Sequence, residues 1–131
     1  MRIEIISTGD EIVTGLVVDT NAAWLSALLL DQGWQVRRRA TVGDNLADLK
    51  TVLQESANRA EVVLVCGGLG PTADDLTAQA AAEAFGQPLA LFPDWLATIA
   101  ARYASRGRPM PASNAKQAWL PQDCEILDNP V

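Results

Sequence analysis

Four consecutive apolar residues, Val62-Val63-Leu64-Val65, place the strongest constraint on the fold of this chain. A strand without polar residues on either face is typical of a parallel sheet that helices cover on both sides. Two further strand-like segments, 3–7 and 35–41, precede this run, and segments with helical spacing of their apolar residues lie between the strands. This alternation predicts an α/β fold with three layers, α/β/α, around a mostly parallel sheet.

Capping residues, prolines and glycines indicate where the helices begin and end. Four helices are expected: one capped by Thr20 or Asn21 and ended by Gly33, one capped by Asn45, one over about 76–85, and one that begins near Pro93 and ends before Gly107. A last strand is expected over 124–127. The apolar residues suffice for one core, so a single domain is expected over residues 1–131.

The charge and the lack of histidine exclude several classes of function. The formal net charge is −6, from 16 acidic and 10 basic residues, whereas nucleic-acid binding requires a basic surface. Without histidine the chain cannot supply a Ser-His-Asp triad, a Cys-His pair or a histidine-ligated zinc site. The N-terminal segment is too short and too polar for a signal peptide, and no apolar run approaches the ~20 residues of a membrane span. We therefore expect a cytoplasmic protein without nucleic-acid or membrane partners.

Each of the first three predicted strands is followed by glycine and then by a carboxylate. The segments are Gly9-Asp10-Glu11, Gly43-Asp44-Asn45 and the stretch 67–75. Ligands of open parallel sheets bind beyond the carboxyl ends of the strands, so these segments are predicted to form one site. Their glycines would let backbone amides approach a phosphate, and the helix that starts near Asp75 would add its free N–H groups. The carboxylates would either hold a divalent metal ion or cap helices.

Other conspicuous residues are explained more simply by folding than by chemistry. The three residues Arg37 to Arg39 lie on a predicted strand, so a solvent-exposed edge strand is favoured over an anion-binding patch. Cys66 ends the apolar run and is expected to be a buried free thiol. The tryptophans are expected in the core or at interfaces rather than as stacking platforms; they are Trp24, Trp34, Trp95 and Trp119.

The glycine and carboxylate segments resemble those of a known family. Its motifs match Ser7-Thr8-Gly9-Asp10-Glu11-Ile12, Asp19-Thr20-Asn21, Val42-Gly43-Asp44-Asn45 and the string Gly-Gly-Leu-Gly-Pro-Thr-x-Asp-Asp-x-Thr at 67–77. These segments resemble the N-terminal domain of the competence/damage-inducible protein CinA family. That domain belongs to a molybdopterin-binding superfamily shared with MoaB/Mog-type and MoeA/gephyrin-type enzymes. Three later segments resemble the CinA branch specifically: Met110, Asn114-Ala115-Lys116-Gln117-Ala118 and Asn129-Pro130-Val131.

The resemblance implies a molybdopterin-binding (MoaB/Mog-like) fold and metal-dependent hydrolysis of ADP-ribose to AMP and ribose 5-phosphate. The implied catalytic residues are Asp44 and Asp75, and with Asp10 they would ligate a divalent metal ion, for which Mg²⁺ is expected. The alternative is a non-catalytic module that binds molybdopterin or a nucleotide. The residues implied to bind a nucleotide or pterin phosphate are Thr8, Gly9, Asp10, Asn21, Gly67, Gly68, Gly70, Pro71, Thr72 and Thr77.

The resemblance also bears on domain organisation and assembly. CinA proteins usually carry a C-terminal nicotinamide-mononucleotide deamidase domain, which this sequence does not contain. The family pattern continues past Asn129-Pro130-Val131 with a further loop and strands, so we expect a domain that is incomplete at its C-terminal end. Members of the superfamily are oligomeric, and a homo-oligomer is expected, a dimer before a trimer. The amphipathic helix over 94–106 would lie at the contact or else pack on its own sheet.

Overall fold

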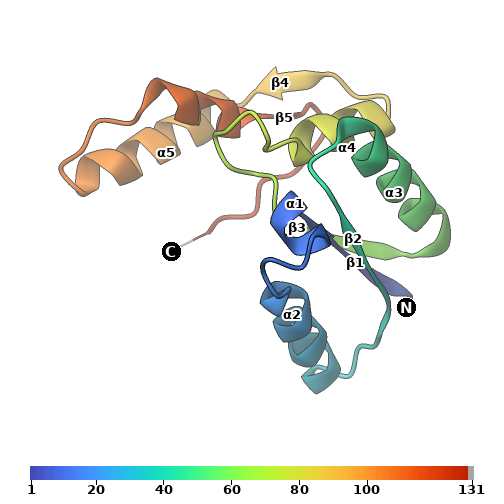
Figure 1. Ribbon diagram of the computed structural model, residues 1–131. Coiled ribbons are helices and arrows are strands. Elements are labelled where there is room, and N and C mark those ends of the chain that lie inside the picture. Colours follow the sequence, from blue (N-terminus) through green and yellow to red (C-terminus); the bar gives the residue numbers. More distant parts are fainter. Residues whose placement is uncertain (130–131) are drawn as a thin grey trace.

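Three parallel strands form the central sheet of the computed structural model, which describes residues 1–129 (Figure 1). The strands are β1 (Ile3–Thr8), β2 (Val36–Val42) and β3 (Val62–Cys66), in the order β2-β1-β3. All six residues of β1 are buried, because strands flank it on both sides and helices cover both faces. Ser7 pairs with Thr41 and with Cys66, so the carboxyl ends of the three strands lie side by side. The predicted parallel sheet is confirmed.

Helices form the two outer layers. The helix α2 (Thr20–Asp31) covers one face of the sheet, while α3 (Leu46–Arg59) and α4 (Thr77–Ala84) pack together on the other (Figure 1). A single short turn, α1 (Asp10–Val13), follows β1. The main core lies between the sheet and the α3–α4 pair; its buried members are Ile6, Leu49, Leu53 and Ala80. The three-layer α/β/α arrangement expected from the sequence is therefore present.

The observed N-cap residue is the predicted one in α3 but not in α2. Asn45 caps α3, as predicted, because its Oδ1 accepts a hydrogen bond from the N–H of Asp48 at 3.1 Å. In α2 the cap is Asp19, whose Oδ1 accepts from the N–H of Ala22 at 3.0 Å. The predicted caps at Thr20 and Asn21 are wrong by one or two positions, since aspartate caps a helix as well as asparagine does and comes first.

The C-terminal third forms a separate unit beside α4. Here β4 (Leu89–Leu91) pairs antiparallel with β5 (Trp119–Pro121), and α5 (Pro93–Ser105) and the 3₁₀ helix η1 (Ala112–Ala118) connect them. The strand predicted over 124–127 is wrong. The N–H of Cys124 donates to the Pro121 carbonyl, so the chain turns immediately after β5, and β4 already pairs with β5.

The helix α5 projects away from the parallel sheet (Figure 1). It packs mainly against η1, and Ile99 is its buried residue. The alternative in which this helix packs on the sheet is therefore wrong. Its contribution to an oligomer remains a prediction.

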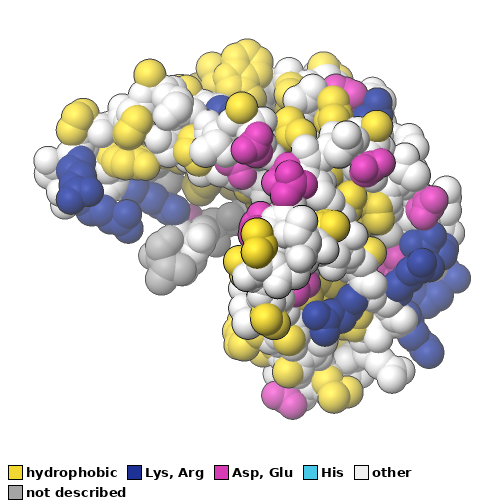
Figure 2. All heavy atoms as spheres, viewed as in Figure 1, with side chains coloured by type: hydrophobic (Ala, Val, Ile, Leu, Met, Phe, Trp, Pro, Cys, Tyr) yellow, Lys and Arg dark blue, Asp and Glu magenta, His cyan; other side chains and the backbone are white. Residues whose placement is uncertain are grey.

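Several large apolar side chains lie on the surface rather than in the core. Trp24 is 64% exposed on α2, and Trp34 and Trp119 are 44% and 45% exposed, so these tryptophans are not core residues. Figure 2 shows hydrophobic side chains gathered over α2, in the lower part of the view. Cys66 is half-buried rather than buried. No helix within residues 1–129 is both long enough and apolar enough to cross a membrane.

Candidate functional site

The carboxylates that follow β1 and β2 bond to each other's backbone. The N–H of Asp44 donates to Asp10 Oδ1 at 2.9 Å, and the N–H of Asp10 donates to Asp44 Oδ2 at 3.2 Å. Gly43 permits this approach, because a Cβ at that position would lie 2.6 Å from Asp10 Oδ1. Neither carboxylate caps α3, which Asn45 does. The two strand ends are thus joined, and each of the two carboxylates keeps one oxygen without a hydrogen bond to residues 1–129.

Gly67 and Gly68 turn the chain directly after β3. Their φ angles are +100° and +68°, in the region that favours glycine. A Cβ on Gly67 would lie 2.8 Å from the carbonyl oxygen of Thr8, and one on Gly68 would lie 2.1 Å from Thr77 Oγ1. Thr77 fixes the turn: its hydroxyl donates to the Gly67 carbonyl at 2.8 Å and its N–H to the Gly68 carbonyl at 3.1 Å. These short distances leave no room for a side chain at position 67 or 68, between the end of β1 and the start of α4.

The hydroxyl of Thr8 lies buried beneath this turn. It forms no hydrogen bond within the part of the chain that the structure describes. Buried hydroxyls are usually hydrogen-bonded, because leaving one unpaired costs about 1–3 kcal/mol. The end of β1 therefore contains an unpaired buried hydroxyl, which lowers stability, at the point where the predicted site residues meet.

Asp75 stabilises the turn that precedes α4. Its Oδ2 accepts hydrogen bonds from the Thr72 hydroxyl at 2.6 Å and from the Thr72 N–H at 2.9 Å. These bonds, with a smaller contribution from the charge of Lys116, lower the pKa of the Asp75 carboxyl despite its partial burial. Asp75 does not cap α4: the N-cap position is Leu76, which provides no side-chain hydrogen bond. The Thr77 N–H is taken by the Gly68 carbonyl. The N–H groups of Ala78 and Gln79, also in the first turn of α4, form no hydrogen bond within residues 1–129 and remain available to an anion.

Two side chains of η1 bond to the backbone of residues 67–75, which we call the glycine-rich loop. Lys116 Nζ donates to the Thr72 carbonyl, and Gln117 Nε2 donates to the Leu69 carbonyl at 3.2 Å. The buried Asn114 orients Gln117 by donating to its Oε1 at 2.8 Å. The prediction of site residues missed all three. Their segment shared the family resemblance, but no spacing rule connects it with a loop more than 40 residues earlier.

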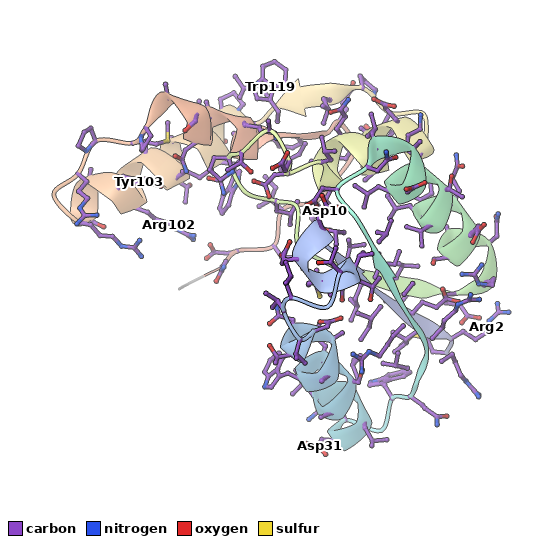
Figure 3. The ribbon with its side chains drawn as sticks, viewed as in Figure 1. Arg2, Asp10, Asp31, Arg102, Tyr103 and Trp119 are labelled. Carbon is purple, nitrogen blue, oxygen red and sulfur yellow. The ribbon has the colours of Figure 1, made fainter. Side chains whose placement is uncertain are left out.

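A pocket of about 690 Å³ opens beside this loop, within the usual size range of small-molecule sites. Gly68, Gly70, Asp75 and Thr77 line one end of it. Side chains of α5, η1 and β5 line the rest, with Lys116 next to the loop; these side chains include Trp95, Arg102, Tyr103, Arg106, Lys116 and Trp119. Figure 3 shows Arg102 and Tyr103 on α5 and Trp119 at the start of β5.

The pocket differs in charge from the rest of the molecule. Three cationic side chains line it, and its carboxylates within the described residues are Asp75 and Glu125, so its local formal charge is +1. The whole chain has a net charge of −6. A positive cavity in an acidic protein attracts anionic ligands, because its low-dielectric walls concentrate the field.

The predicted site residues fall into two groups. One surrounds the turn after β3 and contains Thr8, Gly67, Gly68, Gly70, Pro71, Thr72, Asp75 and Thr77. The other consists of Gly9, Asp10 and Asp44 at the ends of β1 and β2. Asn21 is exposed in the first turn of α2, and within residues 1–129 no hydrogen bond connects it to either group. No three carboxylate or thiol groups of the described residues converge closely enough to hold a metal ion.

Asp19 was not predicted as a site residue, yet it lies near the same ends of the strands on the face covered by α2. Burial opposes ionisation of its carboxyl, but the Ser7 hydroxyl, the N–H of Ala22 and Arg39 outweigh burial and lower the pKa of Asp19. The Ser7 hydroxyl faces this carboxylate without forming a well-directed hydrogen bond. Burial, with the charge of Asp19, raises the pKa of the Cys66 thiol.

The three arginines of β2 lie, as predicted, on an exposed edge strand of the sheet. Arg39 Nη2 lies 3.9 Å from Asp19 Oδ2, at the limit of an ion pair. A surface pair at that distance contributes little to stability. The interpretation of this run as a solvated edge is confirmed.

Known proteins share both the sequence and the fold of this chain. Residues 4–126 match a family described as "probable molybdopterin binding domain". A CinA-like protein of Shewanella amazonensis is 49% identical over all 131 residues. The chain spans about a third of the length of the curated relatives it matches, with 31% of the Shewanella protein covered.

Two solved structures show how far the fold is shared. CinA from Thermoplasma acidophilum, a protein of unknown function, has a TM-score of 0.89 at 35% identity, over 99% of this chain and 76% of that one. The molybdopterin biosynthesis enzyme MoaB from Thermus thermophilus has a TM-score of 0.59 at 27% identity, over 63% of this chain and 53% of that one. The chain therefore belongs to the family of probable molybdopterin binding domains, and within that family to the CinA-like proteins.

Proposed function

We propose that this chain binds a nucleotide phosphate beside its glycine-rich loop and, with a divalent metal ion, hydrolyses the pyrophosphate of ADP-ribose to AMP and ribose 5-phosphate. One observation carries the proposal: the uncapped N-terminus of α4 opens onto a positively charged pocket that Gly68 and Gly70 also line. Free N–H groups at a helix N-terminus favour phosphate, and glycines let a phosphate approach the backbone closely. The description of the family, as molybdopterin binding, supports a phosphate-bearing ligand.

The oxygen donors present fit Mg²⁺. Asp10 and Asp44 lie together, and each retains a carboxylate oxygen without a hydrogen bond in the described structure. Mg²⁺ is commonly held by one or two carboxylates, with water and substrate phosphates completing its octahedral shell. A pair of aspartates is thus a sufficient protein contribution. When bound, the ion would offset the negative charge of the pyrophosphate.

Residues of the glycine-rich loop would position the loop, bind the phosphate and orient the attacking water. The Thr72 hydroxyl already donates to Asp75 and the Thr77 hydroxyl to the Gly67 carbonyl, so both threonines position the loop, and phosphate binding rests on backbone N–H groups. Asp75 lines the pocket and has a lowered pKa, so it is ionised at neutral pH. A carboxylate of this kind is a weak base, and its role would be to orient the attacking water by accepting a hydrogen bond.

A second function, binding without catalysis, is favoured by one observation. Asp10 and Asp44 are not among the residues that line the pocket, and no three acidic or thiol groups of residues 1–129 form a metal cluster. A module of this kind would hold molybdopterin or a nucleotide through the same loop and leave it intact.

Incubation with ADP-ribose, with and without Mg²⁺, separates the two functions. Hydrolysis predicts AMP and ribose 5-phosphate only when the metal is present, and binding of ADP-ribose is measured in parallel by calorimetry. Binding without product in the presence of Mg²⁺ would show that the module does not catalyse this reaction. Neither binding nor product would refute both functions for this nucleotide.

A further inference from the structure

We infer that the α5 end of the pocket is a subsite for the fused, nitrogen-containing aromatic ring of a ligand whose phosphate lies at the glycine-rich loop. The inference rests on the proposed function for the position of the phosphate. The pocket of about 690 Å³ extends well beyond the loop, and its far end is lined by aromatic and cationic side chains. Such a lining is suited to a flat aromatic ring, because aromatic and guanidinium groups stack on its faces.

Arg102 is held in place from two directions. Its guanidinium carbon lies 5.3 Å from the centroid of the Trp95 ring, a cation–π contact. On the side of the C-terminal segment, Arg102 Nη2 donates to the Asn129 carbonyl and lies 3.9 Å from Asp128 Oδ1. The exposed Asp128 lies at the limit of an ion pair and adds little, so the Trp95 ring and the Asn129 carbonyl are the contacts that restrain this planar cationic group.

Two further rings line the same end. Tyr103 follows Arg102 on α5 and is half-buried, and Trp119, at the start of β5, also lines the pocket. Stacking of a nucleic base on an aromatic side chain is sequence-tolerant and contributes substantially to affinity. Aromatic rings from two elements and one guanidinium thus line the pocket, and such groups provide faces for a bicyclic heteroaromatic ring.

These aromatic residues are not explained by packing of the core. Ile99 is the buried residue of α5, which packs mainly on η1, away from the central sheet. Trp95 and Tyr103 are both half-buried and both line the pocket. Arg106, at the end of the same helix, adds a further positive charge to this end of the pocket. Figure 2 shows cationic side chains gathered at the far end of α5.

Adenine and pterin share this ring chemistry, and a binding experiment distinguishes them. AMP and a pterin phosphate are each titrated into the protein by calorimetry, and ribose 5-phosphate serves as a ligand with a phosphate but no aromatic ring. The variants are Tyr103→Leu, which removes the ring, and Tyr103→Phe, which keeps it. Trp24→Leu is the matched control, because Trp24 is an exposed aromatic residue of α2 that does not line the pocket.

We expect Tyr103→Leu to weaken binding of the preferred ring-bearing ligand by at least about tenfold, because stacking on one aromatic residue contributes on this scale. Binding of ribose 5-phosphate should stay within about twofold in every variant, and Tyr103→Phe and Trp24→Leu should bind like the unmodified chain. The ligand that shows the Tyr103 dependence identifies the ring as adenine or pterin.

Two results would overturn the subsite. If Tyr103→Leu leaves AMP and the pterin phosphate unaffected while ribose 5-phosphate binds, the ring does not lie against α5. If the variant weakens ribose 5-phosphate as much as the ring-bearing ligands, the effect is structural. Failure of all three ligands to bind to the unmodified chain refutes the proposed function itself, which distinguishes that outcome from failure of the subsite alone.

Discussion

Replacement of Asp75 by asparagine tests whether this residue serves chemistry or only the fold. In the structure, Asp75 Oδ2 accepts hydrogen bonds from the Thr72 hydroxyl at 2.6 Å and from the Thr72 N–H at 2.9 Å. Asparagine has nearly the same shape and keeps one amide oxygen that can accept both bonds. What the variant loses is the negative charge, and with it the ability to orient a water molecule as a carboxylate does.

The cost in stability is small and can be worked out from these two bonds. A hydrogen bond to a charged acceptor contributes about 1 kcal/mol more than one to a neutral acceptor. Because the site is half-buried, solvent screening reduces the combined loss to about 1 kcal/mol. For a chain of this length, that loss lowers the thermal midpoint by about 3–5 °C.

The loss of activity should be far larger. We expect the rate of Mg²⁺-dependent ADP-ribose hydrolysis to fall at least about a hundredfold in Asp75→Asn, the scale seen when one preorganised polar group is removed from an active site. Asp74→Asn is the matched control, since Asp74 is exposed and adjacent. Calorimetric melting and product analysis are carried out on the same samples. Retained hydrolysis in Asp75→Asn, or a drop of more than about 10 °C in its midpoint, would refute the reasoning.

Three further predictions concern stability and reactivity. Gly68→Ala should destabilise the chain by at least about 2 kcal/mol in urea unfolding, because a Cβ would lie 2.1 Å from a hydroxyl oxygen at a φ of +68°. Gly33→Ala, at a φ of +83° in open space, should cost only about 1 kcal/mol, and equal losses would contradict the steric argument. The buried Glu4 accepts two hydrogen bonds from Arg59 at 3.0 Å, and these bonds lower the pKa of its carboxyl. The stability that this pair contributes is therefore present above pH ~4.3, the pKa of an unperturbed glutamate, and is lost as the pH falls through the lowered pKa. Thermal midpoints between pH 7 and pH 3 should therefore fall less steeply in Arg59→Gln, and parallel curves would rule this pair out as a cause. Burial raises the pKa of the Cys66 thiol, so iodoacetamide at pH 8.5 should label Cys66 much more slowly in the folded chain than in urea, and equal rates would contradict its burial.

Local patterns in the sequence were sufficient to predict the parallel sheet and the helices that follow its strands. The apolar run at 62–65 forms a parallel strand and Asn45 caps a helix, as predicted, because both depend on residues within one strand or one turn. The expected burial of the run on both faces is wrong: β3 is an edge strand whose residues are all half-buried, and the fully buried strand is β1. The antiparallel pair β4–β5 was missed, because each strand has three residues and its partner lies about 30 residues away. Residues 124–127 have the composition of a strand, yet the turn at Cys124, whose N–H donates to the Pro121 carbonyl, leads the chain away from β5 and no pairing forms.

The same distinction applies to the site. Asp10 and Asp44 were expected to meet because the topology of a parallel sheet fixes where successive strands end, and their mutual hydrogen bonds agree with that rule. Lys116 and Gln117 approach the loop from η1, which belongs to the antiparallel unit. No periodicity in the sequence specifies how that unit packs against α4, so these contacts could be seen only in three dimensions.

The central position of β1 has a consequence for amide hydrogen exchange. Each N–H within Ile3–Thr8 faces either β2 or β3, and none of the six residues is exposed to solvent. Such amides exchange with deuterium only when the whole sheet opens, so their exchange rates report the global free energy of unfolding. We therefore expect β1, which ends at Thr8 directly below the glycine-rich turn, to contain the slowest-exchanging amides of residues 1–129.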